Sequence, residues 1–161
     1  MRPNGEVGMV DPATRIAVEV NGVLSRYIAI HDDIFTFSLR RVIPIPGIFR
    51  PIKFDEHRHR LSALQDDLRR CDAAASAVIQ QTPSPHRFLL AIPEYIDSLA
   101  TAIDRLRAIC DHLQAKTEGD ESYTIAAHEA ATAAYQESVT RYRDVGARLN
   151  SELADFQATS G

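Results

Sequence analysis

The sequence of 161 residues is poor in the residues that interrupt or cross-link a fold. It contains no tryptophan, two cysteines, seven glycines and eight prolines. Two cysteines are too few for the disulfide framework of a small secreted protein. Most of the glycines and prolines stand at candidate boundaries, so the long segments between those boundaries are free to form helices.

Further absences exclude whole classes of protein. No stretch approaches the roughly 18 uncharged apolar residues that a membrane-spanning helix needs, and the N-terminus lacks the apolar core of a secretory signal. The formal net charge is −4, a poor match for sequence-blind nucleic-acid binding, which relies on a basic surface. We therefore expect a soluble, cytoplasmic protein that does not bind nucleic acid.

Motifs of known chemistry are also missing. The sequence has no glycine-rich phosphate loop, no Gly-x-Ser-x-Gly elbow and no Cys-x-x-Cys pair. The adjacent carboxylates Asp32-Asp33 and Asp66-Asp67 point about 100° apart on a helix and do not converge as an acid/base pair. No cofactor is predicted, and an enzyme is the weaker hypothesis.

The sequence does contain a regular apolar pattern. Apolar residues recur every three or four positions over four long segments, which is the spacing of one helix face. The predicted helices cover residues 12–41, 55–81, 86–116 and 121–156. In the first of them the apolar stripe runs through Ile16, Val20, Val23, Tyr27, Ile30, Ile34 and Phe37. Cys71 and Cys110 fall on the stripes of the second and third helices, which predicts buried, unpaired thiols.

The ends of the helices are marked by capping residues. Asp11 is a suitable N-cap for the first helix, and Gly119 is a natural residue to end the third. Asp120 or Ser122 is expected to cap the fourth helix. Pro93 lies inside the third pattern, so either the helix kinks there or a new helix begins.

Four amphipathic helices of similar length, with no strand pattern, predict an all-α four-helix bundle. Short connections make the last three helices antiparallel neighbours. The first connection spans about 40 Å when extended, so the first helix can run either way relative to the second. We expect the up-down-up-down antiparallel order as the simplest closure. Residues 11–157 then form one domain, with flexible ends at residues 1–10 and 158–161.

A second apolar line lies beside the stripe of the first helix, turned by about 100°. It consists of Leu24, Ile28, His31, Phe35 and Leu39. One interpretation is that these residues contact a second neighbouring helix within the bundle. The other is that they form an exposed patch that closes a homodimer or binds a protein partner.

The connection between the first two helices is unusually apolar. Residues 42–54 read VIPIPGIFRPIKF, a proline-rich apolar loop that includes Ile45, Ile48 and Phe49 and has basic residues on both sides. It is expected to fold over the bundle. Alternatively it docks into a partner, because proline-rich extended backbone has little entropy left to lose. Apolar tips among basic residues also suit an anionic membrane surface.

Two sets of side chains are candidates for ligand binding. Tyr27, His31 and Tyr142 would line a pocket between helices, although core aromatics with satisfied or rim-exposed hydroxyls are the more common arrangement. Glu56 and His59 form one Glu-x-x-His pair, whereas di-metal bundles need two such pairs. We therefore predict no metal site from this weak pair.

Taken together, the residues favour a non-catalytic helical bundle that self-associates or binds a protein partner. Helix one and the loop at residues 42–54 would supply the contacts. The alternatives are a small-molecule or metal-binding bundle, possibly an enzyme, and a peripheral membrane protein that uses the loop.

Overall fold

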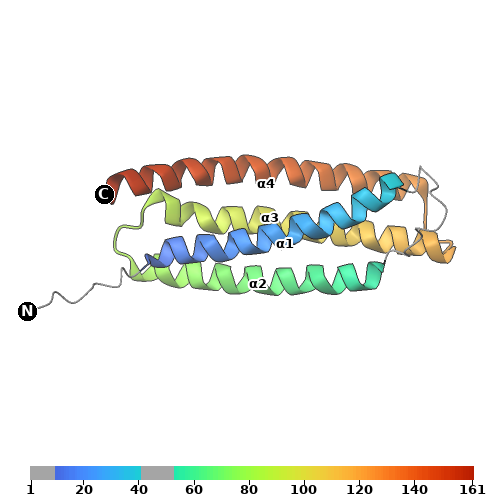
Figure 1. Ribbon diagram of the computed structural model, residues 1–161, viewed down its shortest axis with the longest axis horizontal. Coiled ribbons are helices and arrows are strands. Elements are labelled where there is room, and N and C mark those ends of the chain that lie inside the picture. The colour runs from blue at the N-terminus through green and yellow to red at the C-terminus, as the bar shows by residue number, and fades with distance from the viewer. Residues whose placement is uncertain (1–9, 41–52) are drawn as a thin grey trace, which may run out of the picture.

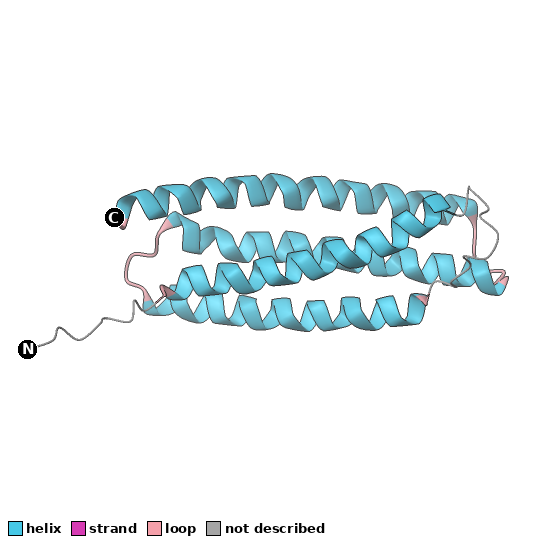
Figure 2. Cartoon of the chain, viewed as in Figure 1, coloured by secondary structure: helices cyan, strands magenta, loops and turns pink. Residues whose placement is uncertain are grey.

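A computed structural model describes residues 10–40 and 53–161, without the side chains of residues 36–40. Within these ranges the chain is almost entirely helical and contains no strand (Figure 2). The helices are α1 (Pro12–Arg40), α2 (Phe54–Gln81), α3 (Arg87–Glu118) and α4 (Ile125–Thr159). They pack into the predicted all-α four-helix bundle. The predicted loop lies almost wholly outside the described residues.

Successive helices run in opposite directions, so the order is up-down-up-down (Figure 1). α3 packs against α2 on one side and α4 on the other, and it also touches α1. α1 lies against α2 and runs obliquely, so that its C-terminal half approaches α4 (Figure 1). The bundle is therefore not square: α3 is its central helix.

The predicted apolar stripes form the core. Every described residue of the α1 stripe, from Ile16 to Ile34, is buried. Leu61, Leu64, Leu68, Cys71 and Ala75 of α2 are buried with them, as are Leu89, Ile92, Ile96, Leu99, Ile103, Leu106 and Cys110 of α3. Full burial of one large aliphatic side chain stabilises the fold by about 1.5–3 kcal/mol, so the stripes supply the main driving force for the bundle.

Side-chain caps begin α1, α3 and α4. The carboxylate of Asp11 accepts a hydrogen bond of 3.1 Å from the Thr14 N–H, as its N-cap position predicts. His86 Nδ1 accepts the Phe88 N–H at 3.1 Å and caps α3. At the other end of α3, Gly119 adopts the left-handed conformation, with φ of 69°, which glycine takes without steric cost.

The start of α4 was predicted wrongly. Neither Asp120 nor Ser122 is the N-cap, because the Asp120 carboxylate instead accepts the Ser122 N–H at 2.8 Å and holds a turn within the connection. Thr124 caps the helix, and its hydroxyl accepts the Ala127 N–H at 3.1 Å. Asp, Ser and Thr are all good N-caps, so the sequence alone does not choose among them. α4 also continues to Thr159, into the residues expected to be a flexible end.

Pro93 does not divide α3, which is one helix from Arg87 to Glu118. The proline stands in the second turn, where its missing N–H removes one backbone hydrogen bond. Buried residues on both sides of it, including Ile92 and Ile96, hold the helix against the core. Tertiary packing therefore outweighs the local cost of the proline.

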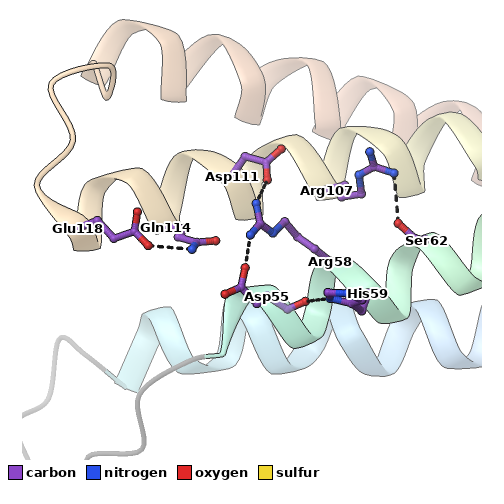
Figure 3. A network of polar contacts seen from close by, with 8 residues as sticks. All are labelled: Asp55, Arg58, His59, Ser62, Arg107, Asp111, Gln114 and Glu118. Carbon is purple, nitrogen blue, oxygen red and sulfur yellow. Dashed lines mark hydrogen bonds and ion pairs between the residues drawn. The ribbon is translucent and has the colours of Figure 1, made fainter.

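Polar contacts align the outer faces of neighbouring helices. Arg58 of α2 lies 2.8 Å from the Asp111 carboxylate of α3 (Figure 3). Further along the same pair of helices, Arg107 donates to the Ser62 hydroxyl at 3.3 Å. Exposed ion pairs of this kind contribute about 0–1 kcal/mol each, so they set the register of α2 against α3 more than they stabilise it.

No helix in the described ranges has both the length and the apolar character that crossing a membrane requires.

Candidate functional site

Aromatic side chains connect α1 to α4. No Cα atom of α1 lies within 8 Å of one in α4 over the described residues, so long side chains must bridge the two helices. Tyr27, His31 and Phe35 follow one another at intervals of four residues and share one face of α1. Tyr135 and Tyr142 stand two turns apart on α4. We call these five residues the aromatic seam.

The rings of the seam contact one another across the two helices. Tyr27 meets Tyr142 edge to face, with ring centroids 5.8 Å apart. Phe35 stacks on Tyr135 with centroids at 5.9 Å and planes only 10° apart. His31 packs against Phe35 at 4.6 Å. Pairs in these geometries contribute about 0.5–1.5 kcal/mol beyond burial, and their size sets the wide spacing of α1 and α4.

A chain of hydrogen bonds runs through the seam. His31 Nδ1 lies 2.6 Å from the Tyr135 hydroxyl, and that hydroxyl is in turn hydrogen-bonded to the hydroxyl of Tyr27. Tyr27 is 1% exposed and Tyr135 2% exposed, whereas His31 is half-buried. The chain therefore leads from the partly exposed imidazole to a hydroxyl in the core.

Burial determines the protonation states in the seam. Burial raises the pKa of Tyr27 and of Tyr135 well above the usual range of tyrosine, so both hydroxyls are protonated at neutral pH. Burial also lowers the pKa of His31. Arg143 opposes its protonation and Asp32 favours it. The seam is thus a neutral network that holds protons rather than a charged acid or base.

The predicted pocket residues do come together. Tyr27 contacts His31 and Tyr142 through its ring, and Tyr142 is buried as well. Their rings pack against one another as core aromatics. A hollow of about 510 Å³ lies elsewhere, on the outer surface between α3 and α4. It is open and mostly charged, lined by Glu94, Glu137, Thr140, Arg141, Asp144, Val145 and Arg148.

The predicted interface residues on α1 differ in exposure. Ile28 is 42% exposed, and Leu24, His31 and Phe35 are half-buried. Leu24 and Phe35 pack against the edge of the core. The side chain of Leu39 is not described, and Ile45, Ile48 and Phe49 lie outside the described residues. The surface that the structure shows is therefore the line from Leu24 to Phe35.

The Glu-x-x-His pair lies at the exposed start of α2. His59 Nδ1 donates to the backbone carbonyl of Asp55 at 2.8 Å (Figure 3), and Glu56 is exposed. Across the described part of the chain, no three His, Cys, Asp or Glu side chains are grouped so that they could hold a metal ion.

Five histidines gather in one half of the bundle. His31 of α1, His57 and His59 of α2, His112 of α3 and His128 of α4 occupy the half that contains the ends of α1 and α3 and the starts of α2 and α4. Among the described side chains, the buried polar atoms without a hydrogen-bond partner are His57 Nδ1, Gln114 Oε1 and His128 Nδ1, all in this half. The histidines and these unpartnered polar atoms of the described side chains therefore lie mostly in one half of the bundle.

Both cysteines are free and buried, as predicted. The Cys71 thiol points to the Glu19 carboxylate of α1, with the sulfur and oxygen 3.9 Å apart. Burial raises the pKa of Cys71, and it raises the pKa of Cys110 to about 12. Neither thiol is a reactive nucleophile at neutral pH, because the thiolate is the reactive form.

Sequence reasoning missed the pairing at the centre of the seam. Tyr135 lies on the apolar stripe of α4, but nothing in the sequence joins it to His31, which is 104 residues away. Arg143, whose charge reaches the same cluster, was also overlooked. Contacts between helices depend on their relative register, which a single sequence does not encode locally.

Comparisons with protein families, with curated proteins and with solved structures returned no match to this chain.

Proposed function

We propose that this chain is a non-catalytic, cytoplasmic protein-interaction module that pairs with a second copy of itself. The pairing surface is the line Leu24, Ile28, His31 and Phe35, which we call the α1 face. The observation that carries the proposal is the exposure of Ile28, which lies in the second apolar line beside the buried stripe of α1 and is 42% accessible. The buried, unpaired thiols fit a reducing compartment.

The α1 face is uncovered because α4 stands away from it. The aromatic seam fills the space between the two helices but reaches only one edge of the face, through His31 and Phe35. Leu24 and Ile28 lie on the outer side of that contact. A line of apolar side chains left partly open to water gains free energy when another surface buries it, by about 25 cal/mol per Å².

The charge distribution leaves the α1 face as a surface on which two copies can meet without charge repulsion. The chain carries a formal charge of −4, so two copies repel each other over most of their surface. No residue of the α1 face has a formal charge at neutral pH. Asn21 and Ser25 border it without charge, and Asp32 borders it at one end. A two-fold axis would bring the same neutral face of each copy together.

The test compares two lysine substitutions on one helix. Ile28→Lys places a charge in the α1 face. Val18→Lys changes another exposed aliphatic residue, 66% accessible, which lies about 100° from the face. We expect the mass of the 17.9 kDa chain to rise toward that of a dimer with concentration in sedimentation equilibrium. Ile28→Lys should raise the dissociation constant at least about tenfold, a cost near 1.4 kcal/mol, and Val18→Lys should leave it unchanged.

Circular dichroism of both variants checks that the bundle is intact. A chain that stays monomeric up to millimolar concentration would exclude self-association. Equal disruption by the two lysines would show that the copies meet through another surface.

A further inference from the structure

The direction of the hydrogen-bond chain in the aromatic seam follows from counting hydrogens. Each tyrosine hydroxyl has one hydrogen to donate. Among the described residues, Tyr135 is the only hydrogen-bond partner of the Tyr27 hydroxyl. That hydrogen therefore points to the Tyr135 oxygen. The Tyr135 hydrogen must then point to His31 Nδ1, 2.6 Å away. This order requires a neutral imidazole with its hydrogen on Nε2.

The opposite order leaves one group unsatisfied. If His31 Nδ1 carries a hydrogen, it donates to the Tyr135 oxygen, and Tyr135 donates to Tyr27. The hydrogen of Tyr27 then has no acceptor, in a side chain that is only 1% exposed. A buried donor without a partner is costly because it gives up its hydrogen bond to water and gains none in return.

We propose that neutral His31 is a proton-sensitive latch, a contact that holds α1 against α4 until its ring is protonated. Protonation reverses the hydrogen-bond chain and leaves the Tyr27 hydroxyl without an acceptor, which weakens the contact between the two helices. The inference concerns contacts within one copy, so it goes beyond self-association and stands without it. The latch matters because no Cα atom of α1 lies within 8 Å of one in α4 in the described structure, so the two helices depend on the rings of the aromatic seam to bridge them.

The groups around His31 act on its protonation in opposing directions. Asp32, on its own helix, favours the protonated ring, whereas Arg143 of α4 and burial oppose it. The hydroxyls of Tyr27 and Tyr135 reach the ring through the chain, and Cys110 of α3 lies close enough to Tyr135 to influence it. Each of these last three groups is neutral at pH 7. Burial and Arg143 therefore outweigh Asp32, and the pKa of His31 lies below the ordinary value for histidine.

The sign of the pH effect follows from proton binding. A folded state with a lowered histidine pKa binds fewer protons than the unfolded state, so the bundle loses stability as pH falls below about 6.5. Burial also lowers the pKa of His57 and of His128. These two histidines therefore also reduce the free energy of unfolding as the pH falls. Comparison with a variant at position 31 is needed to isolate the latch.

Nitrogen-15 NMR of the histidine rings, recorded on dilute protein between pH 8 and 4.5, tests the proposal. His31→Gln assigns the His31 signals by their disappearance. At pH 7.5 we expect His31 Nδ1 to be unprotonated. His59 serves as an internal reference of the opposite tautomer, because its Nδ1 donates to the Asp55 carbonyl. A hydrogen on His31 Nδ1 at neutral pH would overturn the proposal.

One variant separates the latch from simple burial, and a second measures how much of the pH dependence comes from position 31. Tyr135→Phe removes the hydroxyl through which His31 reaches Tyr27, so the His31 titration midpoint should rise toward the ordinary value for histidine. An unchanged midpoint would mean that burial alone sets it and would also overturn the proposal. His31→Gln keeps an acceptor for Tyr135 and cannot titrate. Its urea-unfolding stability should fall less than that of the wild type between pH 7.5 and 5, and this readout remains if Tyr135→Phe does not fold.

Discussion

At the scale of single residues, two mid-helix glycines have opposite surroundings. A Cβ atom built on Gly146 of α4 would lie 3.0 Å from the ring of Tyr95, which is buried in α3. A Cβ atom on Gly22 of α1 would meet nothing within 4 Å. Gly146 therefore allows close approach of α3 and α4, whereas Gly22 is a weak point in its helix.

Alanine at each glycine should reveal this difference. Gly22→Ala should raise the free energy of unfolding by about 0.5–1 kcal/mol, because alanine loses less backbone entropy in a helix. Gly146→Ala gains the same propensity but must push against the Tyr95 ring, an overpacking cost of roughly 1–3 kcal/mol. Urea denaturation should place Gly146→Ala at least about 1 kcal/mol below Gly22→Ala. Equal effects would mean that Tyr95 moves aside freely.

At the scale of the helices, the sequence predicted the buried face of each helix better than the residues at which it begins and ends. The stripes of α2 and α3 fall on the buried residues because a spacing of three and four is set by helix geometry itself. For α4 the apolar spacing predicts a buried Ala130, but Ala130 is exposed. The spacing also misses the buried Ser138, whose hydroxyl donates to the Tyr135 carbonyl. Small residues discriminate poorly between a core and a solvent face, so the pattern is weak where alanine dominates.

The cap of α4 can be tested by one substitution at two positions. Thr124→Ala removes the acceptor of the Ala127 N–H and should cost about 1 kcal/mol of stability. Thr140→Ala lies within the same helix, where the hydroxyl only bonds back to the Gln136 carbonyl. This control should be neutral or slightly stabilising, since alanine is the better helix former. If Thr124→Ala were also neutral in thermal and urea unfolding, the helix would start elsewhere.

At the scale of the whole molecule, the sequence predicted four helices and their antiparallel order but not their unequal packing. α3 contacts each of the other helices, whereas over the described residues no Cα atom of α1 lies within 8 Å of one in α4, and the aromatic seam bridges the two helices. Interhelical distance depends on which side chains meet at the crossing, and that depends on register. Tyr27, His31 and Tyr142 were predicted to lie near one another between helices, and the Tyr27 ring contacts both of the others. The bond from Tyr135 to His31 needed the three-dimensional structure.

Cysteine labelling reports on the integrity of this packing. With a pKa raised to about 12, roughly one Cys110 thiol in ten thousand is ionised at pH 8, and both cysteines are shielded from solvent. We expect a thiol reagent to modify neither residue in the folded protein within minutes, and both at once in denaturant. In a Cys71→Ser variant, the slow labelling of Cys110 should follow the opening of the core. Rapid labelling of the native protein would contradict the burial described above.

The antiparallel order also gives the bundle two unlike poles. α1 begins and α4 ends at the same pole, while five of the six histidines occupy the half of the bundle toward the opposite pole (Figure 1). α1 therefore begins and α4 ends on the side remote from most of the histidines. Fluorescent reporters joined directly to Pro12 and to Thr159 would lie at the same pole of the bundle.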